Sequence, residues 1–122
     1  MRVRGIRGAI TVEENLAKSI VAATKELLLE VISANEVDLE EIASIFFTLT
    51  DDLDAQFPAV AAREIGMRDV PLLCSREVPI QPSLKSCIRI LMHINTDKKQ
   101  TEIRHIYLRK AKALRPDLEK TD

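Results

Sequence analysis

The sequence contains few aromatic residues, glycines and cysteines. Aromatic side chains make up 3% of its 122 residues, tryptophan is absent, and there are 3 glycines and 2 cysteines. With so few rings, nucleic-acid bases are not expected to stack on an aromatic platform, and the core must be aliphatic. Hydrophobic residues at 46% and charged residues at 30% are typical of one folded domain, which we expect to span residues 1–122.

An excess of charge of one sign is also missing. The 18 Lys and Arg residues and the 19 Asp and Glu residues leave a net charge of -1, so no global field attracts nucleic acid or an anionic membrane. No apolar run suits a signal peptide or a membrane-spanning helix, and we expect a cytoplasmic protein. Cys74 and Cys87 lack the CxxC spacing, so reduced thiols are expected instead of a disulfide or a zinc site.

Motifs of covalent and metal-dependent catalysis are absent as well. The sequence contains no nucleophile elbow, HExxH, P-loop or GxGxxG. Asp51, Asp52 and Asp54 follow a predicted strand, where three acids favour a solvated turn over a metal site. His93 and His105 lie on predicted strands without a Ser or Cys partner, so packing is favoured over a role as a base. We expect no metal.

One long helix is predicted over residues 16–34, where apolar side chains recur every three or four positions. The spacing of Thr11 and Glu14 is that of a capping box before it, and Asn35 is a plausible end. A short helix is predicted over residues 57–66, with Pro58 in its first position and Gly66 past its end.

Strands are predicted from alternating apolar residues and from β-branched and aromatic residues. They cover residues 2–12, 42–50, 70–74, 84–94 and 103–108. Strands separated mostly by one long helix favour an α+β or α/β sandwich, with a mixed sheet covered by a helix on one face.

Two of the three glycines, Gly5 and Gly8, lie in the first predicted strand on either side of Arg7. Glycine weakens a strand, so the pair indicates a bulge, a close backbone approach or a ligand against the chain.

Arg89 stands in the middle of an otherwise apolar predicted strand, where a buried guanidinium needs an anionic partner. Two interpretations stay open. One is an internal salt bridge to Glu77 or Glu64. The other is that several arginines converge on a carboxylated ligand: Arg7, Arg63, Arg89 and Arg115.

The same residues fall in motifs of a known family. These motifs are Arg4-Gly-Ile-Arg-Gly-Ala9, Phe57-Pro-Ala59, Arg63, Val70-Pro71, Cys74 with Glu77, Cys87-Ile-Arg89, Arg104-His105 with Tyr107-Leu108, and Leu114-Arg-Pro-Asp-Leu118. In this order and spacing, from about Arg2 to Leu118, the chain resembles the AroH class of monofunctional chorismate mutases.

The resemblance implies an isomerase of phenylalanine and tyrosine biosynthesis that converts chorismate to prephenate. This Claisen rearrangement needs no nucleophile, metal, cofactor or proton transfer. The resemblance also implies an α+β fold with a mixed sheet packed against one long helix, in a homotrimer whose sheets form a pseudo-α/β-barrel. Its active sites would lie between neighbouring subunits.

The resemblance implies roles for three catalytic residues. Arg89 would donate to the ether oxygen of chorismate and to a carboxylate. Arg7, with Tyr107, would hold a carboxylate. Glu77 would receive the ring hydroxyl, together with groups in the neighbouring segment Leu73, Cys74, Ser75 and Arg76.

The remaining expected contacts come from elsewhere in the assembly. Those from the adjacent chain are Phe57, Ala59 and Arg63. Leu114 and Arg115 belong to a C-terminal segment, residues 114–122, that we expect to be mobile and to close over the ligand. Val60 and Leu73 depart from the residues of some relatives, which bears on affinity and not on the reaction. The alternative function is a non-catalytic trimeric binding module that senses a small carboxylate.

Overall fold

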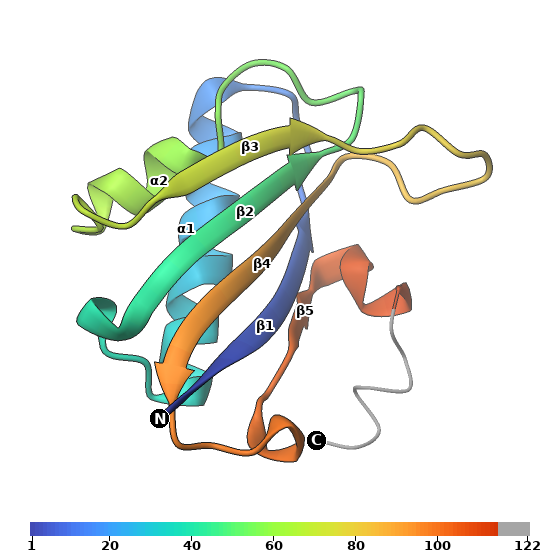
Figure 1. Ribbon diagram of the computed structural model, residues 1–122. Helices are drawn as coiled ribbons and strands as arrows, with labels where there is room; N and C mark the ends of the chain where they lie inside the picture. The colour runs from blue at the N-terminus through green and yellow to red at the C-terminus, as the bar shows by residue number, and fades with distance from the viewer. Residues whose placement is uncertain (115–122) are drawn as a thin grey trace.

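The alternating strands form one mixed five-stranded sheet in the computed structural model, which describes residues 1–114 (Figure 1). The strands are β1 (Arg2–Thr11), β2 (Ile42–Leu49), β3 (Leu72–Arg76), β4 (Cys87–Thr96) and β5 (Ile106–Leu108), in the order β3-β2-β4-β1-β5. Strand β4 is antiparallel to both β1 and β2, whereas β3 runs parallel to β2 and β5 parallel to β1. The predicted mixed sheet is confirmed.

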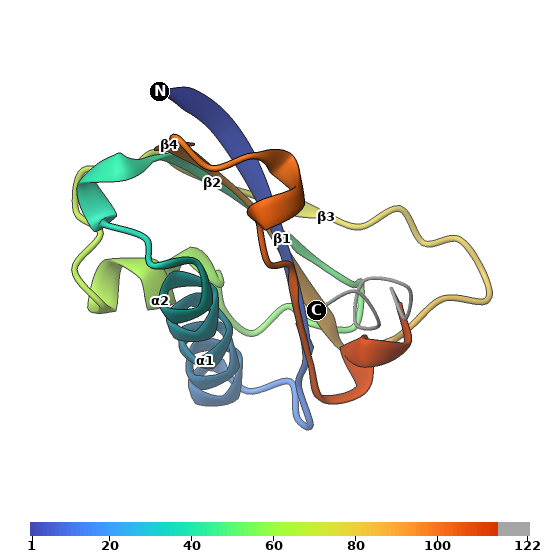
Figure 2. The ribbon, with the colours of Figure 1, turned by 90° about the horizontal axis from the view of Figure 1, so that it is seen from below.

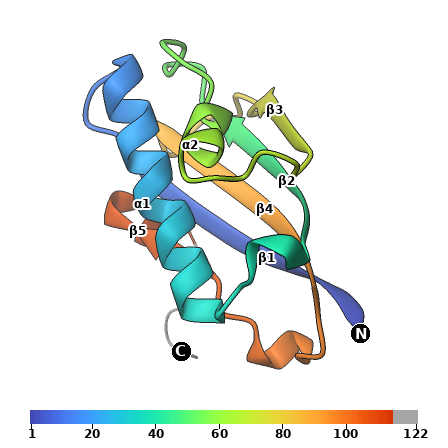
Figure 3. The same cartoon turned by 90° about the vertical axis from the view of Figure 1, so that its left-hand side faces the viewer.

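Two helices cover the same face of the sheet, as Figures 2 and 3 show. They are α1 (Ala17–Asn35), which crosses the sheet, and the shorter α2 (Ala59–Glu64). Three 3-10 turns complete the described chain: η1 (Leu39–Glu41), η2 (Gln100–Glu102) and η3 (Arg109–Ala113). The core lies between α1 and the sheet and is almost wholly aliphatic, with Phe47 the one buried aromatic residue among residues 1–114.

Strand β4 shows how the sequence pattern specifies the core. Ile88, Ile90, Met92 and Ile94 are buried against the helices, while Arg89 and Leu91 point to the opposite face. This alternation was predicted, and each fully buried apolar side chain contributes roughly 1.5–3 kcal/mol through its removal from water.

The predicted capping box at Thr11 and Glu14 is wrong. Helix α1 begins at Ala17, and its N-cap Leu16 makes no side-chain cap. Thr11 instead ends β1, and its hydroxyl accepts a hydrogen bond from the Lys110 amide at 3.2 Å. The hydroxyl is therefore used by the C-terminal turn η3 and is not free to cap a helix.

The predicted end of α1 is confirmed. The helix ends at Asn35, and Glu36 adopts the left-handed conformation with φ 52°. The Asn35 side chain is buried; its amide donates to the Arg104 carbonyl at 2.9 Å, and its oxygen accepts from the Arg104 amide at 2.8 Å. These hydrogen bonds use both the amide and the carbonyl of Arg104, which are then not available for pairing with a neighbouring strand. The strand therefore covers only Ile106–Leu108 instead of the predicted residues 103–108.

Smaller differences concern the ends of other elements. The strand predicted over residues 70–74 is Leu72–Arg76, and the strand predicted over 84–94 is Cys87–Thr96. Pro58 is the N-cap of α2 instead of its first helical residue, and Gly66 follows the helix with φ 103°. Glycine adopts this angle without strain, as its predicted position past the helix end requires.

Gly8 marks the predicted close approach. A Cβ added there would lie 3.0 Å from Cγ1 of Ile90 and 3.1 Å from Cδ1 of Leu27, which belongs to α1. Gly5 shows no such crowding, since its nearest contact would be 3.4 Å from Leu91. Glycine at position 8 therefore lets the long helix pack closely on β1.

Neither α-helix covers the other face of the sheet, which we call the open face, and at one edge of it the 3-10 helix η3 packs with Ala111 buried against Ala9 and Cys87. Large apolar side chains on it are exposed: Phe46 (42%), Leu73 (58%) and Leu91 (37%). No helix in the described residues is long and apolar enough to cross a membrane.

Candidate active site

A pocket of about 500 Å³ opens on the open face, where β1, β2 and β4 meet the C-terminal turn. The structure brings five of the predicted site residues together in it: Arg7, Glu77, Arg89, Tyr107 and Leu114. Its other lining residues are Gly8, Ala9, Phe46, Thr48, Ile90 and Leu91. Two arginines and one glutamate thus share a partly apolar concave surface.

The register of the sheet places these side chains. Ala9 of β1 lies opposite Arg89 of β4, and it also lies opposite Tyr107 of β5. Because side chains alternate along a strand, Arg7 of β1 points to the same face as Ala9, two positions away. The small side chain of Ala9 leaves room between Arg89 and Tyr107.

Arg89 and Glu77 form an ion pair, with Arg89 Nε 3.5 Å from Glu77 Oε2. The same Nε is buried and makes no hydrogen bond within the described chain, while 43% of the side chain is exposed. The salt-bridge interpretation is therefore confirmed for Glu77. It is wrong for Glu64, which pairs with Lys25 at 2.5 Å.

Glu77 is fixed by both its backbone and its side chain. It follows β3, and its amide donates to the Leu49 carbonyl at 2.8 Å, which continues the β2–β3 pairing by one residue. The Thr48 hydroxyl donates to Oε2 of its carboxylate. The Glu77 side chain is 22% exposed and lines the pocket.

Arg7 is held by an unexpected partner. Its backbone amide donates to Nδ1 of His105 at 2.9 Å, so this ring nitrogen acts as the acceptor. His105 immediately precedes β5, and it supplies the acceptor at the end of the short β1–β5 ladder. The predicted packed histidine thus supports the strand that carries Arg7.

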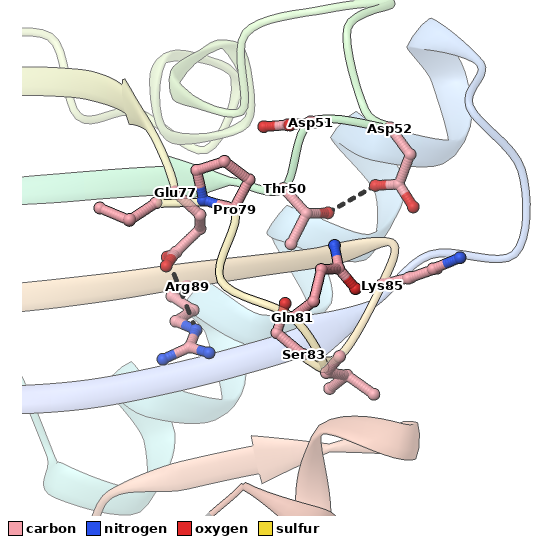
Figure 4. Close-up of a pocket in the computed structure, with 11 residues that line it drawn as sticks. Thr50, Asp51, Asp52, Glu77, Pro79, Gln81, Ser83, Lys85 and Arg89 are labelled. Atoms are coloured by element: carbon pink, nitrogen blue, oxygen red, sulfur yellow. Dashed lines mark hydrogen bonds and ion pairs between the residues drawn. The ribbon is translucent and has the colours of Figure 1, made fainter.

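A second cavity of about 230 Å³ shares Glu77 and Arg89 with the pocket. Figure 4 shows the residues that line this second cavity. It lies under the loop that links β3 to β4. Asp52 fixes the base of this loop. It accepts from the Thr50 hydroxyl at 2.6 Å and from the Ser86 amide at 3.0 Å.

These bonds shift the titration of Asp52. Partial burial by itself would raise the pKa of this carboxyl, but the hydrogen bonds from Thr50 and Ser86 outweigh it, and the pKa is lowered. The predicted acidic turn is confirmed. Residues 1–114 hold no group of three or more His, Cys, Asp or Glu side chains that could bind a metal ion.

The other predicted site residues lie outside the pocket. Phe57 (66% exposed), Ala59 and Arg63 lie in or beside α2, next to the edge strand β3. The Arg63 guanidinium donates to the Met67 and Arg68 carbonyls at 2.6 and 2.7 Å. We call these residues, together with Leu73 and Cys74 of β3, the α2–β3 cluster.

Cys74 joins the two elements of the α2–β3 cluster. Burial raises the pKa of its thiol, and a hydrogen bond with the Ala59 backbone partly offsets that rise. Ser75 lies in β3 opposite Thr48, and Arg76 points away from the pocket and donates to the Asp51 carbonyl at 3.2 Å. Arg115 lies outside the described residues.

Burial also raises the pKa of Cys87, which is fully buried, although the positive charge of nearby Arg89 partly opposes this shift. Both cysteines are free thiols.

Thr48 was not predicted from the sequence as a site residue, and His105 was predicted only as a packed histidine. Thr48 is a polar residue in an apolar strand, a weak signal that becomes informative only when the register places it opposite Arg89. His105 shows no pattern of its own, because its acceptor role depends on β5 lying beside β1.

The fold and pocket define an α+β protein whose open face carries a concave site with two arginines, a charge that suits a small anionic ligand. The family model of chorismate mutase type I matches residues 3–118. The chain belongs to that family, and its activity is that of a chorismate mutase, an isomerase of aromatic amino-acid biosynthesis.

Individual relatives agree with this assignment. The chain is 57% identical to chorismate mutase AroH of Thermus thermophilus over 118 residues, which cover 96% of this chain and 97% of the relative. It is 44% identical to chorismate mutase AroH of Bacillus subtilis over 122 residues, 99% of this chain and 96% of the relative. A solved chorismate mutase from Clostridium thermocellum superposes with a TM-score of 0.88 at 49% identity, covering 89% of this chain and 97% of that one.

Proposed function

We propose that the pocket on the open face binds chorismate and converts it to prephenate, with Arg89 as the principal catalytic residue. Arg89 lines the pocket beside Glu77, and the observation that carries this proposal is that its buried Nε has no hydrogen-bond partner in the described chain. A buried donor without a partner is costly, so a ligand acceptor at this point would satisfy it.

The chemistry suits such a site. The rearrangement is unimolecular, so the protein must hold chorismate in a compact chair-like conformation and stabilise charge as the bonds change. The ether C–O bond breaks while the new C–C bond forms, and the ether oxygen gains negative charge in the transition state. A guanidinium placed against that oxygen binds the transition state more tightly than the substrate.

The other pocket residues then have distinct roles. Arg7 and Tyr107, on adjacent strands, hold one carboxylate, for which the guanidinium fork is well suited. Glu77 accepts the ring hydroxyl and at the same time orients Arg89 through their ion pair. Leu114, at the end of the described chain, covers the apolar part of the pocket.

We further propose that the active protein is a homotrimer with active sites between subunits. One chain carries the pocket on β1, β2, β4 and β5, whereas the α2–β3 cluster lies at the opposite edge of the sheet (Figure 1). The exposed Phe46, Leu73 and Leu91 give the open face an apolar surface of the kind that subunits bury. The α2–β3 cluster of a neighbour, with Phe57, Ala59 and Arg63, would complete each pocket.

The direct test is to add chorismate and follow the loss of its ultraviolet absorption together with the appearance of prephenate. Turnover without added metal or cofactor is expected. Calorimetry that detects tight binding of chorismate without conversion would instead favour the non-catalytic binding module.

A mixing experiment tests the shared site. Arg89→Ala and Arg63→Ala chains, each weakly active alone, are unfolded and refolded together. If each site combines one half from each of two neighbours, random trimers regain about a quarter of the parental activity. As a control, a chain that carries both substitutions is unfolded and refolded alone, and it should regain no activity. Failure of the mixture to regain activity, although light scattering shows mixed trimers, would contradict the shared site.

We also propose that the enzyme works in the cytoplasm. Its two cysteines are free thiols, which suits a reducing compartment. Cell fractionation followed by the chorismate assay tests this location.

A further inference from the structure

We propose that Thr48 is a positioning residue for the reaction: its hydroxyl holds the Glu77 carboxylate in the orientation that leaves Arg89 available to the substrate. This inference rests on the roles proposed above for Glu77 and Arg89. It adds to them a residue that touches neither the ether oxygen nor the ring hydroxyl in that scheme.

The sheet brings the three residues together from three segments. Thr48 of β2 lies directly opposite Arg89 of β4 and, on its other side, opposite Ser75 of β3. Glu77 follows β3, where its amide is bound to the Leu49 carbonyl. Its backbone is thus fixed one residue beyond Thr48, and the rotation of its side chain remains to be set.

The hydrogen bond from Thr48 sets that rotation. The hydroxyl donates to Oε2, which is also the oxygen that lies 3.5 Å from Arg89 Nε. Both of these contacts fall on one oxygen of the carboxylate, and within residues 1–114 Oε1 accepts no hydrogen bond. Oε1 is left to accept the ring hydroxyl of chorismate.

Without the Thr48 hydroxyl, Glu77 and Arg89 could form a more favourable ion pair. A carboxylate and a guanidinium favour two parallel hydrogen bonds, and a freely turning Glu77 could approach Arg89 in that way. Two guanidinium donors would then be bound to Glu77 instead of to the substrate. At present Nε makes no hydrogen bond, which indicates that Glu77 is held away from this arrangement.

The test compares variants of two hydroxyl-bearing residues of β2. Thr48→Val keeps the β-branched shape and removes the donor, whereas Thr48→Ser keeps the donor. The matched control is Ser44→Ala, on the same strand and the same face, where the hydroxyl lies 3.2 Å from His93 Nδ1 outside the pocket. Unfolding curves and light scattering on each variant show whether the fold and assembly are intact.

We expect Thr48→Val to lower kcat by about 10- to 100-fold, the effect of losing one hydrogen bond to a charged group. Thr48→Ser should stay within about twofold of the parent because it keeps the donor. Ser44→Ala should do the same, which is the usual effect of a substitution away from a site. A Thr48→Val protein that is folded and assembled but retains the parental kcat would overturn the proposal.

A double-mutant cycle with Glu77→Ala separates positioning from a structural role. If Thr48 acts through Glu77, adding Thr48→Val to Glu77→Ala causes no further loss of kcat. An additive loss would overturn the positioning role. If Glu77→Ala itself keeps full activity, the proposed function of Glu77 fails; if Glu77→Ala is impaired and Thr48→Val is not, only the role of Thr48 fails.

Discussion

The Nε atom of Arg89 lies 3.5 Å from Oε2 of Glu77, on the face of the sheet that neither α1 nor α2 covers. The two residues reach this position from opposite ends of the loop that links β3 to β4. Glu77 compensates part of the charge of Arg89 and also limits where the guanidinium can point. A guanidinium whose orientation is fixed before the substrate binds suits a reaction in which negative charge develops at one oxygen.

Removing Arg89 should therefore abolish most of the catalysis. We expect Arg89→Ala to lower kcat by a factor of ~10² or more, about 3 kcal/mol of transition-state stabilisation. The measurement is the chorismate assay on a variant shown to fold and assemble. Arg2→Ala, an exposed arginine at the start of β1, serves as the control for loss of a positive charge. Near-parental turnover of Arg89→Ala would refute the role of this residue.

The absence of a proton transfer step has a kinetic signature. We expect kcat to be nearly flat across the neutral pH range, to be unaffected by metal chelators, and to change little in heavy water, because no group gives or takes a proton. A steep bell-shaped pH profile centred near the pKa of histidine would contradict this mechanism.

Gly8 should be intolerant of larger residues. A side chain there would enter the contact with Leu27 and Ile90, so Gly8→Val is expected to lower the free energy of unfolding by about 1–3 kcal/mol through overpacking. Urea unfolding at one fixed protein concentration measures the change. Combining Gly8→Val with Leu27→Ala should cost less than the sum of the two single changes, since the shorter side chain makes room. Strict additivity would show that helix α1 does not limit this position.

Asp52 should make stability depend on pH in the acid range. Its pKa in the folded protein is below the ordinary value of 3.8, so the stabilisation is fully present above that value and is lost as the pH falls through the lower folded pKa. Asp52→Asn should flatten the loss of stability in this window. Urea unfolding at a series of acid pH values tests it, with Asp69→Asn, on an exposed bend, as the control for loss of one negative charge. Parallel curves for the parent and Asp52→Asn would show that the hydrogen bonds from Thr50 and Ser86 contribute nothing.

Local patterns in the sequence predicted the fold well where the chain satisfies its own hydrogen bonds. The end of α2 is one example, because the Gly66 amide donates to the Arg63 carbonyl three residues back, where Gly66 was predicted to follow the helix. The alternation along β4 is another. Predictions failed where a distant segment competes, as when the Lys110 amide binds the Thr11 hydroxyl and the Asn35 side chain binds the backbone of Arg104.

In the candidate site, too, local sequence patterns predicted some features and others depended on the tertiary structure. A lone arginine in an apolar strand pointed to an anionic partner, and the family motifs pointed to Glu77 as part of one site with it. Only the structure shows which glutamate pairs with Arg89. Glu77 does so, whereas Glu64 of helix α2 forms an ion pair with Lys25 of helix α1. The contribution of Thr48 could not be predicted, because a hydroxyl in a strand acquires a partner only through the register.

The sequence by itself determined the aliphatic core, the mixed sheet with one long helix, and the family with its arginine-rich motifs. Because the net charge of the chain is near zero, an anion site requires a local concentration of positive charge. The tertiary structure decided which charges meet: strand order and register bring Arg7, Glu77, Arg89 and Tyr107 to one pocket and leave the α2–β3 cluster at the other edge. The physical reason is that helix and strand preferences act over a few residues, whereas the pairing of strands far apart in sequence depends on how the whole chain buries its apolar faces.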